Sequence, residues 1–537
     1  MQKDSMLNAI NRIVTGYGLA LLAVVFTANI FASIYGLDNI SMVQAFGLDE
    51  ARYVMKLRVS LEQSTLDPDM FFSYGNLYDT VGYYWISLFE RFGWTINTQL
   101  IGFVLRFISI VAGVLSGLAL WGLSEHLGLP RIVAAGVGLG LVTMPDFMIL
   151  SRTMHPDTLQ TLFVVLGLGT SLIRPSFGFA LLSAFWAGLA FSTKYVGAAI
   201  LPFSFLPLAL TTLASHPISL LLLARLFGQG LAMIAVFAAV FVITNPYAVR
   251  DFSMFYEAFI WQIKYSSTGH GIVEPADPAL WLIPLKQQFG LGLIYLFSGW
   301  FLACLFLLVR LRDIGWRAAS LSAETRTSFV LALYVFVASA HLAISINDRE
   351  PRFTYHIVPF LLLLSTATWL KALLVLTKKF VPPAWITAAF ATLLMACASA
   401  QAGSDLRKMA TETTKLEAES IVFGNSISLK YPGATKVLAD SYTYLPPVMA
   451  NVTYTTLQTK ELLGNEAPEL IVLTRGATGN YIWKEPGTSF KERKFVRDLR
   501  YAATPQVEAY VNDLLSPASG WSLVAENSSE VLFARNR

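Results

Sequence analysis

The most constraining feature of this sequence is a series of long apolar runs, each roughly 17–25 residues, the length of helix that crosses a bilayer core. Only helices and closed barrels satisfy their backbone hydrogen bonds in lipid, and these runs lack the alternation of barrel strands. Charged residues make up 14% of the 537 residues and the mean hydropathy is +0.55, whereas soluble proteins carry about 25% charged residues. The sequence therefore predicts a polytopic α-helical membrane protein.

The apolar runs predict about eleven transmembrane helices. Lys and Arg gather in alternate loops, which the positive-inside rule assigns to the cytoplasm. The N-terminus is then cytoplasmic, the C-terminus is outside, and the first run is interpreted as an uncleaved signal anchor. The predicted spans lie near residues 16–36, 98–122, 131–148, 158–173, 176–192, 196–213, 226–244, 290–309, 328–346, 353–370 and 383–400.

Four cations lie in short outer connections, where the orientation bias should have removed them: Arg152, Lys194, Arg349 and Arg352. A cation kept there needs an anion, and Arg106 within the second span has the same need. The anion could be a phospholipid headgroup, a nearby carboxylate or the phosphate of a lipid-linked substrate. Local pairing is an open alternative for the cations of segment 347–356.

Two adjacent acids, Asp49 and Glu50, open the first outer loop, which covers residues 37–97. A loop of this length is usually functional or separately folded. Helical spacing predicts interfacial helices over 49–61, which contains Tyr53, and over 77–92. An aromatic turn that includes Tyr74 lies between them. The acids suit either a solvated loop start or an active site at the membrane face.

Further polar residues mark the other outer connections. Asp157 and His155 lie in a short loop between apolar spans, where such polarity is costly without a site to serve. With Asp49 they could ligate a divalent metal ion, although no fixed ligand spacing is present. His270, in the third outer loop, and Tyr355, before a late span, are additional site candidates.

The composition changes near residue 401, where spans stop and turn residues and charges begin. We expect a transmembrane domain over 1–400 and an extracytoplasmic soluble α/β domain over 401–537, long enough for its own core. The residue patterns predict strands over 420–423, 436–439, 469–474 and 521–534, the last with a polar break, and a helix over 505–515. The small net charge of +4 points to no nucleic acid.

Taken together, the outer motifs resemble integral-membrane glycosyltransferases of the GT-C fold, in the branch of protein O-mannosyltransferases and lipid A aminoarabinose transferases. The likeness covers about residues 15–370 and rests on the order of the motifs and their common membrane face. The motifs are Asp49-Glu50, the aromatic turn 67–78, Arg152 with His155-Pro156-Asp157, 192–195, Asn245-Pro246-Tyr247, and Arg352 with Pro359.

The resemblance implies a polyprenyl-phosphate sugar donor, an outward-facing active site and inversion at the anomeric carbon. The acceptor would be a hydroxyl of a lipid, glycan or protein, and the protein would lie in the inner membrane of the cell envelope. Transfer needs a base and a cationic clamp for the leaving phosphate. We expect Asp49 to be the base, supported by Glu50, with Asp157 as the alternative base. We expect Lys194 and Arg352 to bind the donor phosphate. Arg152 and Arg349 are weaker candidates for that role. A secondary transporter or flippase of a lipid-linked or anionic substrate is the alternative, although no internal repeat is evident.

Overall fold

The computed structural model describes most of the chain, from the N-terminal helix to the last strand. Some side chains within the described ranges, that of Asp49 among them, lie outside this description. The described residues are 2–46, 48–67, 74–268, 278–347, 349–377, 381–408, 414–434, 436–440, 443–449, 452–455, 468–474, 481–482, 494–495, 504–527 and 530–536.

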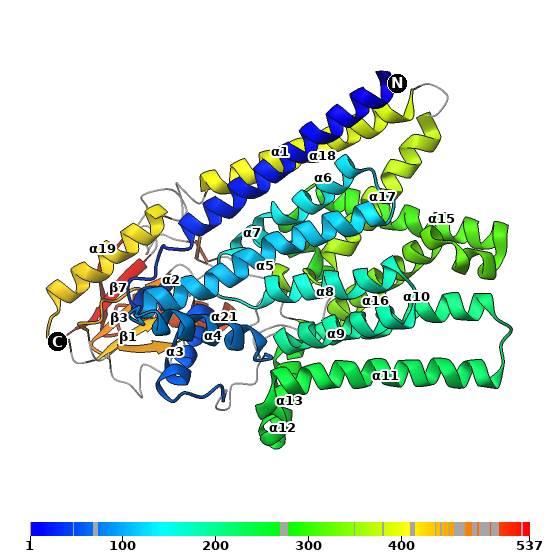
Figure 1. Cartoon of the computed structure of the whole chain (residues 1–537). Helices are drawn as coiled ribbons and strands as arrows, with labels where there is room; N and C mark the ends of the chain where they lie inside the picture. Colours follow the sequence, from blue (N-terminus) through cyan, green and yellow to red (C-terminus); the bar gives the residue numbers. More distant parts are fainter. Residues whose placement is uncertain are drawn as a thin grey trace.

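The chain is a polytopic helical membrane protein, as the apolar runs predict, and its long helices lie alongside one another (Figure 1). Within the described residues, eight helices are long and apolar enough to cross a membrane, and a bent pair makes up to nine. Two shorter apolar helices of 17 residues each lie among them. The bundle helices are α1 (Gln2–Ala32), α5 (Thr98–His126), α6 (Arg131–Val142), α7 (Pro145–Ser151), α8 (Asp157–Ile173), α9 (Phe177–Thr193), α10 (Ile200–Ser215), α11 (Leu220–Thr244), α15 (Gly292–Leu321), α16 (Ala323–Ser345), α17 (Val358–Thr377) and α18 (Pro383–Lys408).

Each predicted span coincides with a helix, but prolines change two of them. The span predicted over 131–148 is broken, because α6 and α7 meet at an angle of 67°. Pro145 cannot continue the helical hydrogen bonds, and Met144 before it is extended. The span predicted from 353 begins only at Val358, because the 3₁₀ turn η3 (Pro351–Thr354) precedes it. The η3 segment contains the candidate site residue Arg352, and Arg152 directly follows α7.

Short helices cover one end of the bundle, beside the C-terminal sheet (Figure 1). Two helices form in segment 37–97 close to the bounds that their spacing predicts, α3 and α4, and Tyr53, Val54 and Leu57 of α3 share a buried face. The shorter elements are α2 (Ile40–Phe46), α3 (Leu48–Glu62), α4 (Leu77–Arg91), η1 (Tyr195–Ala199), α12 (Pro246–Arg250), α13 (Phe252–Thr268), η2 (Pro278–Trp281) and α14 (Leu282–Phe289).

The C-terminal region is an α/β unit in which helices cover both faces of a mixed five-stranded sheet of order β2-β1-β3-β7-β6. Alternate residues of β3 face opposite sides, so Ile471 packs with Tyr510 of α21 and Val472 packs with Phe423 of α19. β1 pairs in parallel with β2 and β3, whereas β7 is antiparallel to β3 and β6. The elements are α19 (Thr414–Lys430), β1 (Val437–Asp440), β2 (Val452–Thr455), β3 (Leu470–Thr474), β4 (Tyr481–Ile482), β5 (Lys494–Phe495), α21 (Thr504–Leu515), β6 (Trp521–Glu526) and β7 (Glu530–Arg535).

One predicted strand of this region is wrong. Residues 420–423 lie inside α19, a continuous 17-residue helix. A short apolar run does not distinguish a strand from the buried face of a helix. Here Phe423 and Ile427, one helical turn apart, both pack on the sheet.

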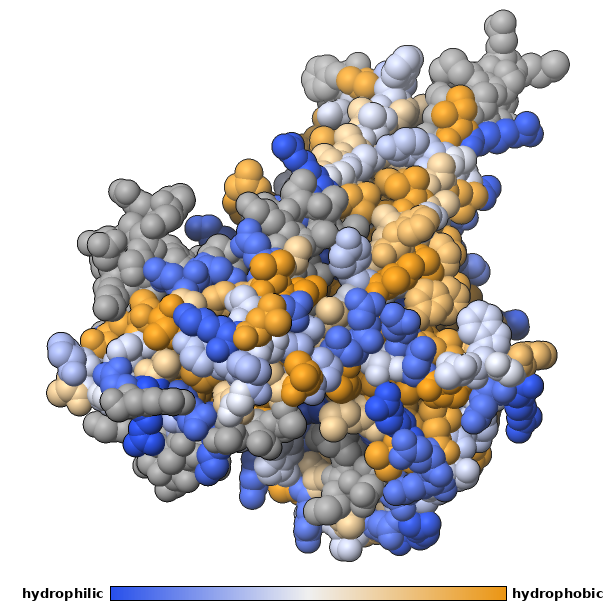
Figure 2. Space-filling view, turned by 90° about the vertical axis from the view of Figure 1, so that its left-hand side faces the viewer, coloured by the Kyte–Doolittle hydropathy of each residue, from blue (hydrophilic) through white to orange (hydrophobic). Residues whose placement is uncertain are grey.

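The end of the molecule that carries the sheet is mixed in character (Figure 2). Hydrophilic residues are spread across this end, whereas apolar residues gather on the helices that rise behind it. The apolar flank suits lipid tails and the mixed end suits the headgroup layer and water.

Candidate functional site

A buried ion pair between Asp157 and Lys194 forms the centre of the candidate site. Asp157 is the first residue of α8, and Lys194 directly follows α9 in an extended conformation. A three-residue connection makes these helices antiparallel neighbours, so the start of α8 meets the end of α9. Lys194 Nζ donates to Asp157 Oδ1 at 2.7 Å, and the two residues are 5% and 2% exposed. Both charges are therefore kept away from bulk water and depend on each other.

His155 connects this pair to Arg352. Its Nδ1 contacts Asp157 Oδ2, and its Nε2 lies 3.2 Å from a terminal guanidinium nitrogen of Arg352. A guanidinium can only donate, so Nε2 is the acceptor and the ring proton is assigned to Nδ1, facing Asp157. Burial lowers the pKa of His155 from its ordinary value. The neutral imidazole of His155 therefore lies between the Asp157 carboxylate and the Arg352 guanidinium and contacts both.

Aromatic rings enclose the Lys194 ammonium. Lys194 Nζ lies 4.6 Å from the ring centroid of Phe353 and 5.3 Å from that of Tyr74. The Tyr74 ring also meets the His155 ring edge-on, with the centroids 5.6 Å apart. Ring faces attract a cation, so the two rings stabilise the ammonium beside its partner Asp157.

The α3 helix approaches the cluster through Tyr53, whose ring centroid lies 6.2 Å from that of His155. Tyr53 also packs edge-on against Tyr78 of α4, at 5.5 Å. Position 49 lies one helical turn before Tyr53 in the backbone of α3. The Asp49 side chain lies outside the described residues.

Glu50 pairs with Arg106 of α5 in a buried, bidentate contact. Arg106 Nε and one terminal nitrogen lie 3.1 Å and 2.5 Å from the two carboxylate oxygens. The other terminal nitrogen donates to the carbonyl oxygens of Ser33 and Tyr35. Glu50 Oε1 also accepts from the backbone N–H of Met154 at 2.6 Å. The pair thus joins the end of α1, α3, α5 and the segment before His155, and the anion for Arg106 is a local carboxylate.

The turn that carries Tyr74 is fixed by its backbone. A Cβ on Gly75 would lie 2.0 Å from the carbonyl oxygen of Ser192, so only glycine permits this approach. The N–H of Asn76 donates to Asn245 Oδ1 at 2.6 Å, and the Tyr195 hydroxyl donates to the Tyr74 carbonyl at 3.1 Å. Three of the motifs noted in the sequence therefore meet at one place.

The remaining predicted site residues have different surroundings. Arg352 Nε contacts Glu350, so the local pairing that the sequence left open occurs for this arginine. Arg349 is buried, and Arg152 is half-buried after α7.

Tyr355 is buried against Phe147 and receives a hydrogen bond from Gln288 at 2.8 Å, and burial raises its phenol pKa well above the ordinary value. It is therefore no candidate base. His270 lies outside the described residues.

The expected metal set of Asp49, His155 and Asp157 is only partly described. Among the side chains that the structure describes, no group of three His, Cys, Asp or Glu residues could hold a metal ion. Both ring nitrogens of His155 already face partners, so a metal there would have to displace Asp157 or Arg352.

Sequence reasoning missed Phe353 and His356 as parts of this region. Both follow Arg352 within segment 347–356, but neither residue type signals a role outside its tertiary context. Burial lowers the pKa of His356 to about 3, so this second imidazole is also neutral.

The fold of the chain is similar to that of two solved structures of one other protein. It is 15% identical to ArnT from Cupriavidus metallidurans bound to undecaprenyl phosphate, covering 97% of this chain and 98% of that chain with a TM-score of 0.52. For the same protein in the apo state the identity is 14%, the TM-score is 0.50 and the coverage is the same. No protein-family model and no curated protein sequence matches the chain. The GT-C-like fold expected from the motifs is confirmed, and at this identity the likeness shows the fold alone.

Proposed function

We propose that this protein is a membrane glycosyltransferase that moves a sugar from a polyprenyl-phosphate-linked donor to a hydroxyl acceptor on the extracytoplasmic face. The observation that carries the proposal is the aromatic-walled cluster in which buried Asp157, Lys194 and His155 meet the half-buried Arg352. It lies at the bundle end that carries α3, in a fold shared with a protein that binds undecaprenyl phosphate. Cations retained at a membrane face suit the phosphate of a lipid-linked donor.

The reaction is a displacement at the anomeric carbon. The acceptor oxygen forms a bond to that carbon while the bond from the carbon to the phosphate oxygen breaks. The lipid phosphate leaves with the bonding electrons, and the acceptor proton passes to a carboxylate. Attack opposite the leaving group inverts the anomeric centre, and fixed cations stabilise the phosphate charge as it grows.

Asp49 is the base in this proposal. Asp157 is held by an ammonium and by an imidazole N–H, and a carboxylate stabilised in this way is a weak proton acceptor. Glu50 is engaged with Arg106 and with the Met154 N–H. Position 49 shares a face of α3 with Tyr53, one turn later, and Tyr53 packs on His155. Asp157 then serves to position Lys194 and His155.

Lys194 and Arg352 hold the donor phosphate. An ammonium has three donors, so Lys194 can keep Asp157 and still bind a phosphate oxygen. Arg352 presents a planar fork that can hold two oxygens, so Arg352→Lys should also impair donor use. Arg152 and Arg349 are weaker candidates for the same role.

The test is transfer from a defined polyprenyl-phosphate sugar by the purified chain. Asp49→Asn keeps the shape and removes the proton acceptor, and general-base catalysis contributes roughly 10²–10⁴-fold, so we expect a loss of that order in kcat with folding intact. Lys194→Ala should instead weaken donor use more than acceptor use. Asp313→Asn, on the exposed pair with Arg312, is the matched control and should keep normal turnover.

The outcomes separate the roles. Near-normal turnover of Asp49→Asn together with an inactive Asp157→Asn would move the base to Asp157. Near-normal turnover of both would reject the transferase proposal for these motifs.

A further inference from the structure

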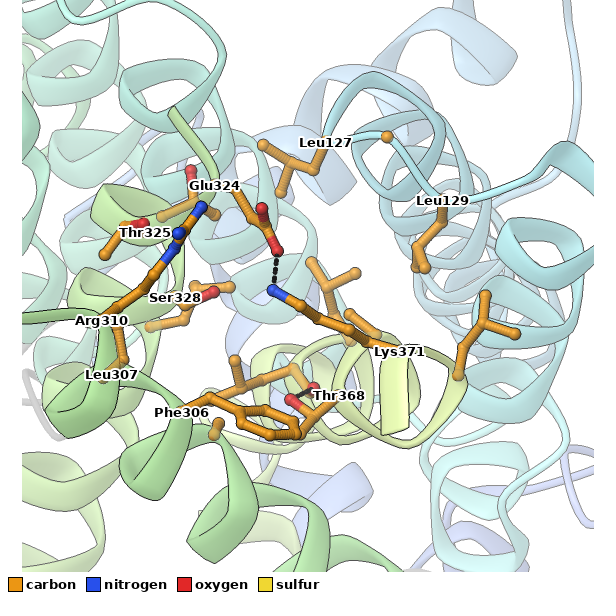
Figure 3. Close-up of a pocket in the computed structure, with 18 of the residues that line it drawn as sticks. Leu127, Leu129, Phe306, Leu307, Arg310, Glu324, Thr325, Ser328, Thr368 and Lys371 are labelled. Atoms are coloured by element: carbon orange, nitrogen blue, oxygen red, sulfur yellow. Dashed lines mark hydrogen bonds and ion pairs between the residues drawn. The ribbon is translucent and has the colours of Figure 1, made fainter. Parts of the chain in front are cut away.

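A second site candidate lies at the opposite end of the bundle. A cavity of about 630 Å³ opens between the middle of α15, the second half of α17, the first turns of α16 and the connection from α5 to α6 (Figure 3). Its position follows from α16, which begins at the cavity and ends just before the segment of Arg352. At about 1.5 Å per residue, the 23 residues of α16 separate the two sites by roughly 35 Å.

The inner wall of this cavity is apolar. Leu307, Leu331, Leu363 and Leu364 are among its lining residues. The volume falls in the range of about 300–1,000 Å³ that is typical of small-molecule sites. All three contributing long helices cross the membrane, so the wall is continuous with the lipid-facing part of the bundle. Such a wall suits an acyl chain and offers nothing to a small soluble anion.

The mouth of the cavity is cationic. Arg310 of α15 and Lys371 of α17 extend toward the first turn of α16, where Glu324 lies (Figure 3). Lys371 Nζ pairs with Glu324 at 2.5 Å, but the two side chains are 46% and 60% exposed, and pairs this exposed contribute little free energy. Within the described part of the chain, Arg310 forms no ion pair. A phosphate could therefore take both cations at little cost.

Hydroxyl groups complete the mouth. Ser328 and Thr368 line the cavity below the charged groups. The cations, the hydroxyl groups and the apolar wall follow one another from the membrane surface inward, which is the order of phosphate, glycerol ester and acyl chain in a phospholipid. The Thr368 hydroxyl donates to the Leu364 carbonyl at 2.7 Å, so toward a ligand it can only accept.

We propose that this cavity binds an anionic phospholipid of the leaflet at the Arg310 end, with its phosphate between Arg310 and Lys371 and an acyl chain against the leucine wall. The proposal depends on the fold and not on the transferase activity. Under the topology inferred from the loop charges, this is the cytoplasmic leaflet.

The experiment measures lipid binding to the full-length chain in detergent by native mass spectrometry, with phosphatidylglycerol and phosphatidylcholine as probes. We expect phosphatidylglycerol to bind more tightly. Arg310→Ala and Lys371→Ala should each weaken its binding roughly fivefold, the contribution of one basic residue near an anionic surface. Arg312→Ala is the matched control, because that side chain is 81% exposed on the same helix.

Two further variants test the cationic mouth and the cavity volume separately. Glu324→Gln removes the competing carboxylate and should strengthen phosphatidylglycerol binding. Ser328→Trp fills the cavity and should abolish binding while both cations remain. All variants are compared at equal monodispersity.

Equal binding of the two lipids would overturn the proposal, as would an equal loss in Arg312→Ala or retained binding in Ser328→Trp. Displacement of bound phosphatidylglycerol by inorganic phosphate alone would assign the mouth to a free anion and reject the lipid.

Discussion

At the scale of single residues, the candidate site consists of charges that are buried only because each has a partner. Asp157 receives a hydrogen bond from Lys194 and contacts His155, and His155 receives one from Arg352. Burying a charge costs several kcal/mol unless it is paired, so the stability contributions of these contacting side chains depend on one another. Removing one of them affects the fold as well as any chemistry.

This coupling predicts a non-additive pair of substitutions. Lys194→Met leaves the Asp157 carboxylate buried beside an apolar chain, so we expect it to destabilise the protein by about 3–5 kcal/mol. Asp157→Asn in the same chain removes the uncompensated charge, so the double variant should recover part of that loss. The measurement is the midpoint of thermal unfolding in detergent. Additive losses would contradict the pairing, and the double variant should remain impaired in donor use.

The buried imidazoles predict an acid-sensitive stability. The pKa of His356 is about 3 in the folded chain, whereas an unfolded histidine has a pKa of about 6.5. Between these values the unfolded state binds the proton and the folded state does not, so stability is present above about pH 6.5 and falls on acidification toward pH 3. His155 contributes with the same sign.

The check compares unfolding midpoints across this pH window for the wild type and for His356→Gln. The variant cannot take up the proton, so its midpoint should fall less on acidification. Parallel curves would show that His356 titrates normally.

At the scale of elements, the site depends on helix ends being held together. The break before Pro145 and the 3₁₀ turn before α17 bring His155 and Arg352 to the antiparallel ends of α8 and α9. The pair of Glu50 and Arg106 ties α3 to α5 and anchors the Met154 N–H beside this cluster. Glu50 therefore acts through the position of its neighbours.

This role predicts that Glu50→Gln loses stability more than chemistry. The amide oxygen can still accept from the Met154 N–H, but the Arg106 charge stays buried without its anion, at a cost of about 3–5 kcal/mol. Asp313→Asn at the exposed pair should cost less than about 1 kcal/mol. Unfolding midpoints and turnover per folded molecule distinguish the roles. A stable but inactive Glu50→Gln would make Glu50 a direct participant.

At the scale of the whole molecule, the structure places the C-terminal sheet at the same end as α2, α3 and α4 (Figure 1). The contact includes Met42 and Ala45 of α2 against Tyr444. One face of the membrane therefore carries both the candidate transferase site and the α/β unit.

The loop charges predict that this face is extracytoplasmic. In intact cells, an impermeant maleimide should label Leu429→Cys, which is 82% exposed on α19, in a chain with Cys304 and Cys397 replaced by alanine. Arg312→Cys at the other end should be protected until the membrane is permeabilised. The reverse pattern would invert the topology and move the proposed site to the cytoplasm.

The sequence alone determined the class of the protein and most of its helices. Long apolar runs leave a chain in lipid only one way to satisfy its backbone, so the bundle could be predicted from composition and length. The helices α3 and α4 could be predicted from local spacing, and most of the strands from residue type. The errors at residues 131–148 and 420–423 arose where a proline or the tertiary context overrode the local pattern.

Only the tertiary structure decided which charged residues meet. The sequence named Asp157, Lys194, His155 and Arg352 as outer polar residues, but it could not pair them, because they are separated by up to 197 positions along the chain. It also could not separate Glu50, which binds Arg106, from its neighbour Asp49. Burial and partnership are properties of packed surfaces, and the free energy of a charge depends on its partners and on water far more than on its place in the sequence.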